Sequence, residues 1–276
     1  MDVKYDLILL GATGYTGQLF LPYMVKRLPA DLRWAIAGRN KSKLENVANE
    51  NGVVEAGGSV IALDLTSQSE ITKLARSTRV LINIIGPYAT TCGSMVFKAC
   101  AENGILYVDG AGEPVWRQDM IKQYQDAAVA SGARMVITCG WGAVPADVST
   151  YLAVDALRKS FSVPTLEVVG ALYDIKGSAS GGAIDSVVTT IARNSLSRLF
   201  SAMKFDSISR ARPAHDPKIK SALPTMNIFG VQTIDGLGTL ATHFHEPVDL
   251  PLVGRSWGLS ETGPEAVPQI HVLVES

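Results

Sequence analysis

Residues 7–24 read LILLGATGYTGQLFLPYM, an apolar run followed by three glycines and then a helical pattern. A strand that passes through such a turn into a helix is the context in which this glycine spacing predicts a dinucleotide site. The first glycine would permit a tight turn, the second would let the backbone approach a pyrophosphate, and the third would bring the helix close to the sheet. The residues expected to contact the cofactor are Gly11, Thr13, Gly14, Tyr15, Thr16 and Gly17. The alternative is a merely structural turn between a strand and a helix.

Short apolar runs alternate with helical patterns through the first half of the chain, as in a parallel sheet covered on both faces. We predict strands at residues 5–11, 33–38, 59–64, 80–86, 106–112 and 134–140. The helices expected between them are residues 16–27, 41–50, 67–76, 94–103 and 114–131. This order predicts an α/β fold with a Rossmann-type, doubly wound parallel sheet.

The rhythm changes after residue 140. Longer strands are expected at residues 164–175, 225–236 and 238–251, with a helix near residues 182–200 and a polar surface loop at residues 206–221. We therefore predict a nucleotide-binding domain over residues 1–140. A second, smaller α+β domain with a mixed sheet, serving substrate binding and dimerisation, is expected over residues 141–276.

The composition excludes several classes of protein. Lys and Arg number 25 against 26 Asp and Glu, so no strong positive field would attract nucleic acid. The apolar runs are too short to span a membrane. Three cysteines without a CxxC pair suit a reducing compartment, and we expect a cytoplasmic protein without a bound metal.

The end of the second predicted strand, AGRNKSK at residues 37–43, indicates which dinucleotide binds. An NAD site usually has Asp or Glu there for the ribose hydroxyls, whereas this chain has Arg39, with Asn40, Ser42 and Lys43 close by. A guanidinium suits a 2′-phosphate, so NADP(H) is favoured. Alternatively, Arg39 only caps the strand and Lys43 lies on a solvated helical face.

Further cofactor contacts are expected at the ends of the next two strands. Asp64 suits the rim of the adenine site, although a role in a turn or helix cap is as good an interpretation. The fourth strand ends in NIIGPY, where we expect cofactor contacts at Asn83, Gly86, Pro87 and Tyr88. Ligands of open α/β sheets bind at this carboxyl edge.

The candidates for catalysis and for the substrate pocket are few. Tyr88 could donate a proton or simply pack in the core, and Glu113 could act as an acid or begin a helix before Pro114. No Tyr-x-x-x-Lys pair is present. The residues expected at the substrate pocket are Trp141, Tyr173, His243 and His245. The two histidines would share one face of a strand, where zinc binding is possible but a half-exposed strand explains them without function.

Together these motifs resemble the saccharopine dehydrogenase-like oxidoreductases, in particular the branch of trans-acting enoyl reductases. The matching stretches are GATGYTGQ (11–18), WAIAGRNKSKL (34–44), NIIGPYATTCGSMVFKAC (83–100), YVDGAGEP (107–114) and CGWGAVPAD (139–147). The resemblance implies a Rossmann domain, NADP(H), and reduction of a conjugated C=C or related bond in an apolar or carrier-bound substrate. The chain departs from the family at Gly142, Ala143 and Ala183, where polar groups are usual, and it is shorter than relatives of this kind.

We therefore expect an NADP(H)-dependent reductase of an apolar, polyketide- or terpenoid-type metabolite. A non-redox isomerase or cyclase on the same scaffold and a silent NADP-binding accessory subunit are the alternatives. A shortened second domain would leave an apolar sheet face uncovered, which predicts a homodimer.

Overall fold

The structure is a computed structural model that describes residues 3–162, 165, 167–174, 176–177, 179–209, 231–243, 245–259 and 269–275. It divides into two compact units. Unit 1 comprises Met1–Cys139 and Ala179–Arg193, and unit 2 comprises Gly140–Ser178 and Asn194–Ser276. Each unit is described by itself.

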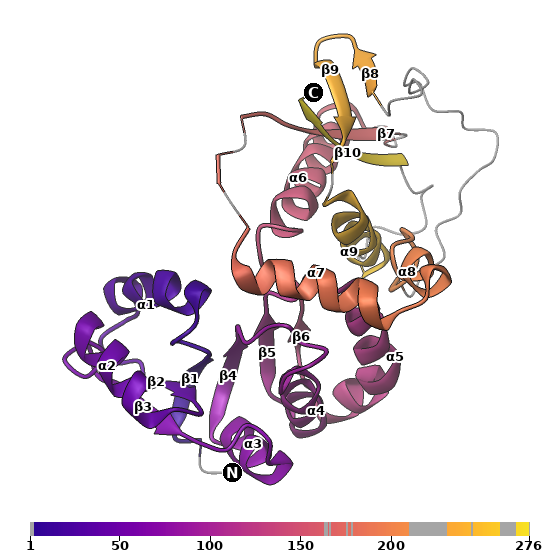
Figure 1. Cartoon of the computed structure of the whole chain (residues 1–276). Helices are drawn as coiled ribbons and strands as arrows, with labels where there is room; N and C mark the ends of the chain where they lie inside the picture. Colours follow the sequence, from indigo (N-terminus) through magenta and orange to yellow (C-terminus); the bar gives the residue numbers. More distant parts are fainter. Residues whose placement is uncertain are drawn as a thin grey trace. The chain divides into compact units, whose positions relative to one another are not determined.

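Unit 1 is built on a six-stranded parallel sheet in the order β3-β2-β1-β4-β5-β6 (Figure 1). The strands are β1 (Tyr5–Leu10), β2 (Trp34–Gly38), β3 (Gly58–Ala62), β4 (Thr78–Asn83), β5 (Leu106–Asp109) and β6 (Met135–Val136). The order reverses between β1 and β4, which lie side by side although two strands separate them in sequence. This switch point is where a doubly wound sheet binds its ligand, so the predicted fold class is confirmed.

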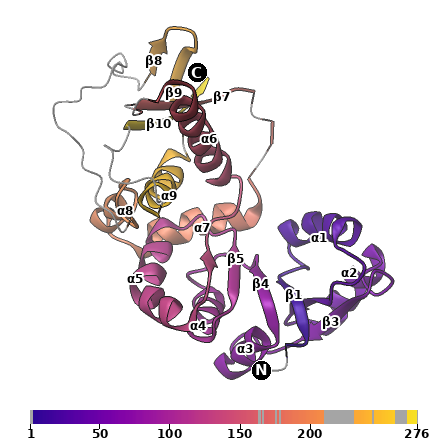
Figure 2. The same ribbon diagram turned by 180° about the vertical axis from the view of Figure 1, so that it is seen from behind.

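The crossover helices of unit 1 also follow the predicted order, as Figure 2 shows from behind. They are α1 (Tyr15–Arg27), α2 (Lys41–Asn51), α3 (Gln68–Arg76), α4 (Gly93–Asn103) and α5 (Pro114–Ser131). Local chemistry sets their ends. The side chains of Asn40 and Ser67 cap the starts of α2 and α3, and the left-handed Gly52, Gly104 and Gly132 end α2, α4 and α5.

The core of unit 1 forms where helices pack on the central strands. Leu9 of β1 and Ile36 of β2 are fully buried, and Leu21 of α1 and Leu44 of α2 pack into the same cluster. Because parallel strands are covered on both faces, β2 is buried along its whole length.

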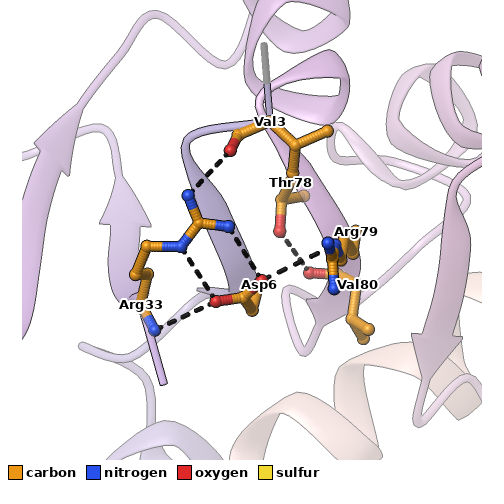
Figure 3. A network of polar contacts seen from close by, with 6 residues as sticks. All are labelled: Val3, Asp6, Arg33, Thr78, Arg79 and Val80. Atoms are coloured by element: carbon orange, nitrogen blue, oxygen red, sulfur yellow. Dashed lines mark hydrogen bonds and ion pairs between the residues drawn. The ribbon is translucent and has the colours of Figure 1, made fainter. Parts of the chain in front are cut away.

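An ionic network ties the amino ends of three strands together (Figure 3). The glycine turn follows the opposite, carboxyl end of β1. The Arg33 guanidinium donates to both carboxylate oxygens of Asp6, at 3.1 and 3.0 Å, and to the carbonyl of Val3 at 3.0 Å. Arg79 lies 3.6 Å from the same carboxylate. These hydrogen bonds from Arg33 hold the pKa of Asp6 below its ordinary value. The network is structural and leaves the carboxyl edge free for function.

Unit 2 contains a four-stranded sheet in the order β7-β10-β9-β8. Its elements are α6 (Val144–Phe161), β7 (Glu167–Leu172), α8 (Leu196–Ala202), β8 (Val231–Ile234), β9 (Gly238–Thr242), α9 (Glu246–Leu259) and β10 (Gln269–Glu275). The β7–β10 pair is parallel, whereas β9 pairs antiparallel with both β10 and β8. The predicted mixed sheet is confirmed.

One expectation for unit 2 needs correction, and two others lie partly outside the described residues. The strand predicted over residues 238–251 is wrong beyond Thr242, because α9 begins at Glu246. Pro247 in the first turn and the acidic Glu246 and Asp249 near the positive end of the helix favour this start. Most of the predicted loop at residues 206–221 lies outside the described residues, as does the first part of the strand predicted at 225–236.

One helix from the second half of the chain belongs to the first unit. We expected everything beyond residue 140 in the second domain, but α7 (Gly181–Arg193) lies in unit 1. The physical reason is a contact between residues distant in sequence: the Ser186 hydroxyl of α7 donates to Glu113 at 3.0 Å, beside Gly86 in the loop after β4. The chain thus leaves unit 2, contributes α7 to unit 1, and returns.

Candidate functional site

The glycine turn after β1 has the backbone geometry that its sequence predicts. Gly11 has φ of 108°, in the left-handed region, and a Cβ there would lie 2.8 Å from Cγ1 of Ile85. A Cβ at Gly17 would collide with the carbonyl oxygen of Gly11 and lie 2.7 Å from Cα of Ala12. Two of the glycines are therefore required by the fold, one for the turn and one for close packing of α1.

The start of α1 offers an uncapped helix end at this turn. Gly14 is the N-cap and contributes no side-chain hydrogen bond, and no acidic residue stands in the first turn. Among the described contacts, no acceptor is found for the backbone N–H groups of Tyr15, Thr16 and Gly17. Gly14, Tyr15 and Thr16 are exposed, while Thr13 is half-buried. Unpaired N–H groups and a positive helix end fit a pyrophosphate.

Arg39 follows β2 beside this turn, since the N–H of Gly11 donates to the carbonyl of Ala37 at 3.2 Å. Its exposed side chain borders a cavity of about 620 Å³ at the start of α2, lined by Arg39, Asn40, Lys41, Ser42 and Glu45. In the described part of the chain, no hydrogen bond or ion pair engages the Arg39 guanidinium. An open cavity with an available guanidinium suits a phosphate.

The residues after Arg39 form the start of α2, and Asn40 and Ser42 line the same cavity. Asn40 is the N-cap of α2: its Oδ1 accepts from the N–H of Lys43 at 3.0 Å and from the Ser42 hydroxyl at 2.9 Å. Lys43 is exposed and does not line the cavity. Lys41, which the sequence analysis left out, does line it, with its ammonium 3.7 Å from Glu45. The run of basic residues could have suggested Lys41, but only the helix geometry shows which lysine faces the cavity.

Asp64 forms a turn after β3. Its carboxylate accepts from the N–H and the hydroxyl of Thr66, at 2.8 and 2.7 Å, and these bonds lower its pKa. The turn was one of the two predicted interpretations. Its exposed carboxylate could still border the adenine site, which stays a proposal.

The end of β4 is held by buried hydrogen bonds. Oδ1 of Asn83 accepts from the N–H of Ile85 at 3.1 Å, and its carbonyl accepts from the Tyr88 hydroxyl at 2.9 Å. The same hydroxyl accepts from the N–H of Gly110 at 3.2 Å. The carbonyl of Pro87, which follows Gly86, accepts from the Thr91 hydroxyl at 2.9 Å. This loop therefore has a fixed shape.

Tyr88 lies inside that loop rather than on its surface. Its side chain is 5% exposed, its ring lies 5.1 Å from that of Trp116, and burial raises the pKa of its hydroxyl well above the ordinary value. Because the hydroxyl already bonds two backbone groups, the geometry favours the structural interpretation of Tyr88 over proton donation.

Glu113 is also buried, at 1% exposure, and stands at the start of α5. Its carboxylate makes no cap bond to α5. Instead it accepts from the N–H groups of Tyr88 and Ala89, at 2.6 and 2.9 Å, and from the hydroxyl of Ser186. Glu113 is thus the N-cap residue of α5 by its position in the backbone, while its side chain binds the loop after β4.

A second buried acid, Asp109, lies at the end of β5 on this edge. Its Oδ1 accepts from the N–H groups of Ala111 and Thr138, at 3.0 and 2.8 Å. Burial raises its pKa to about 6, although those hydrogen bonds and the nearby Arg117 oppose the rise. The sequence analysis did not select Asp109 as a site residue, and its position at a strand end was the signal available.

The predicted substrate-pocket residues lie in unit 2. The Trp141 ring lies 5.5 Å from that of His243 and 4.8 Å from that of His245. The histidines follow β9 in a turn rather than sharing a strand face, and burial lowers the pKa of both. Tyr173 follows β7, where its hydroxyl donates to the carbonyl of Leu237 at 2.6 Å. Across the described residues, no three His, Cys, Asp or Glu side chains gather as metal ligands would.

Comparison with known proteins identifies the first unit. Residues 7–136 match the model of the saccharopine dehydrogenase NADP-binding domain. They form a domain of this family. The match confirms the resemblance predicted from the motifs and also the predicted cofactor, NADP(H). The glycine turn, the uncapped helix end and Arg39 are the features of this NADP-binding domain that fit the cofactor.

Three relatives match between 54% and 80% of this chain. A lipid droplet localized protein of Caenorhabditis elegans is 36% identical over 163 residues, covering 57% of this chain and 37% of that protein. A trans-acting enoyl reductase of Mycobacterium leprae is 32% identical, covering 54% and 35% respectively. The human saccharopine dehydrogenase-like oxidoreductase is 27% identical, covering 80% and 53%. The chain thus spans between 35% and 53% of the length of these relatives.

Among the described helices, none combines the length and the apolar character needed to cross a bilayer.

Proposed function

We propose that this protein is an NADP(H)-dependent reductase of a conjugated C=C or related bond in an apolar substrate. The observation that carries the proposal is the open, uncapped start of α1 beside the exposed Arg39, at the carboxyl edge of the sheet. Relatives named as enoyl reductases and oxidoreductases support the reaction class. A polyketide- or terpenoid-type substrate stays part of this proposal.

In this proposal the cofactor, when bound, supplies the hydride, and the chain supplies position. The start of α1 would bind the pyrophosphate, and Arg39, joined by Lys41, would bind the 2′-phosphate. The loop after β4, fixed by Asn83, Tyr88 and Glu113, would shape the nicotinamide side. The side chains of Tyr88 and Glu113 are already hydrogen-bonded within the protein and are not available as proton donors. This agrees with catalysis by positioning in a dry crevice, which needs few acids.

A non-redox isomerase or cyclase is the second candidate, and one observation favours it. Burial lowers the pKa of His243 and His245, so both imidazoles are neutral at pH 7 and able to accept a proton, with the Trp141 ring beside them. A silent NADP-binding accessory subunit is the third. We further propose a homodimer in the cytoplasm.

The test is to incubate purified protein with NADPH and with acyclic enones or α,β-unsaturated acyl thioesters of increasing chain length. A reductase consumes one NADPH for each saturated product. Product formed without loss of NADPH absorbance would instead support the isomerase, and NADPH binding without any product would support the accessory subunit. A failure to bind NADPH would contradict the reductase and the accessory subunit.

A further inference from the structure

The buried carboxylate of Glu113 joins two segments that are far apart in sequence. From the loop after β4 it accepts the N–H groups of Tyr88 and Ala89, at 2.6 and 2.9 Å. From α7 it accepts the hydroxyl of Ser186 at 3.0 Å. Since Ser186 lies 73 positions away in the chain, this bond fixes a contact that no local propensity would create.

The arrangement requires a carboxylate rather than any polar side chain. Oε1 accepts from Tyr88 and Ser186, and Oε2 accepts from Ala89. A glutamine amide has only one accepting oxygen, so whichever way it turned, its NH₂ would face a backbone N–H of the loop. A buried donor without an acceptor is costly, and the loop or α7 would have to move.

The segments that Glu113 joins stand at the edge where the proposed cofactor site ends. The glycine turn contacts the start of the loop, because a Cβ at Gly11 would meet Ile84 and Ile85. On the other side, a Cβ at Gly86 would lie 3.5 Å from the Tyr88 ring and 3.7 Å from the Ser186 hydroxyl. The backbone at Gly86 thus lies between the glycine turn and α7.

We infer that Glu113 is a positioning residue that holds the β4 loop and α7 together as the nicotinamide side of the cofactor site. The inference rests on the proposed function for the identity of the ligand. The joining of loop and helix rests on the hydrogen bonds alone. In the part of the chain that the structure describes, no hydrogen bond or ion pair joins Glu113 to the adenosine side of the site, at Arg39 and α2, so that side is left unchanged.

The binding test compares two ligands with the Glu113→Gln variant. NADPH has a nicotinamide, whereas 2′-phospho-ADP-ribose lacks it but keeps both phosphate groups that the other half of the site would bind. We expect the variant to bind NADPH about tenfold more weakly, which is the effect of one unsatisfied buried donor, and to bind the fragment as the wild type does. Glu102→Gln, at an exposed carboxylate on α4, is the matched control and should change neither affinity.

Equal weakening of both ligands, or of neither, would overturn the positioning role. Hydrogen exchange without ligand tests the joining separately: Glu113→Gln should speed exchange at the amides of Tyr88 and Ala89 and in α7. Unchanged exchange would overturn the inference even if NADPH binds. Should Glu113→Gln not fold, Ser186→Ala keeps both loop bonds, and it should speed exchange in α7 alone and weaken NADPH but not the fragment. If Glu113→Gln speeds exchange but the wild-type protein binds neither ligand, the proposed function is contradicted and, with it, the nicotinamide role.

Discussion

Arg39 is the residue on which the proposed preference for NADP(H) depends. Arg39→Asp should weaken NADPH far more than NADH, because only NADPH carries the 2′-phosphate that the guanidinium would bind. Since the side chain is exposed, the loss should be at the lower end of such effects, about 2 kcal/mol or roughly 30-fold in Kd. Titration calorimetry measures both cofactors.

The control for this variant is Arg134→Asp. Arg134 is also exposed, but it precedes β6 at the amino end of the sheet. Arg134→Asp therefore changes the net charge by the same amount but lies away from the proposed cofactor site. Similar losses for NADPH and NADH in Arg39→Asp would remove the 2′-phosphate assignment.

Asp109 should make stability depend on pH. Its pKa is about 6 in the folded protein against an ordinary value of 3.8, so its protonated form favours folding. This contribution is fully present below the unfolded value and is lost as the pH rises through 6. Asp109→Asn keeps an oxygen for Ala111 and Thr138 without the charge. The variant should therefore gain stability relative to the wild type between pH 4 and 7, by about 1–3 kcal/mol.

Denaturant unfolding of both proteins at several pH values in this range measures that difference. A difference in the free energy of unfolding that stays constant with pH would show that Asp109 titrates normally. A gain that grows as the pH falls would show that its charged form is the one stabilised.

At the scale of elements, two glycines at the start of α1 have different roles: Gly17 is needed for the fold, and Gly14 is expected to be needed for the ligand. Gly17→Ala should lower stability by about 1–3 kcal/mol, because its Cβ would meet the backbone of Gly11 and Ala12. A Cβ at Gly14 would lie 3.5 Å from the Gly11 carbonyl oxygen, an ordinary contact. Gly14→Ala should therefore keep the unfolding temperature and weaken NADPH. Thermal unfolding and calorimetry on both variants test the pair, and a stable Gly17→Ala protein would contradict the packing argument.

The elements of unit 1 could be predicted because each carries its own local signal. Apolar runs give the strands, and Asn40, Ser67 and Pro114 mark the starts of helices. The predicted strand ends were too long because side chains turn back on the backbone there. Asn83 accepts from Ile85, and Asp109 accepts from Ala111.

The placement of other residues depends on contacts distant in sequence, which a single sequence does not reveal. The position of α7 in unit 1 follows from its contact with Glu113 and the β4 loop. The burial of Tyr88 follows from packing on Trp116. His243 and His245 were expected on the strand predicted at residues 238–251, but Pro247 and two acids start a helix there instead. The type of each residue could be used to predict its local structure, but its contact partners could not be predicted from the sequence.

At the scale of the whole molecule, unit 2 offers a surface for the proposed dimer. α6 packs on β7, α9 packs on β10, and the two helices contact each other, so they cover one face of the sheet. All six residues of β7 are half-buried, including those on the other face. Among the described helices of unit 2, α6 and α9 are the ones that pack on this sheet, and an apolar face that is left to a partner is typical of an interface.

We propose that this other face packs against its twofold mate, which covers one surface with a copy of itself. Val168 and Val169 of β7 point to opposite faces of the sheet, because successive side chains of a strand alternate. Only one of Val168→Lys and Val169→Lys should therefore convert the dimer to a folded monomer, while the other lowers stability by placing a charge under α6. Light scattering at micromolar concentration and thermal unfolding distinguish the two effects. A wild-type protein that is monomeric under these conditions would mean that the second face needs no partner, and the dimer should then be abandoned.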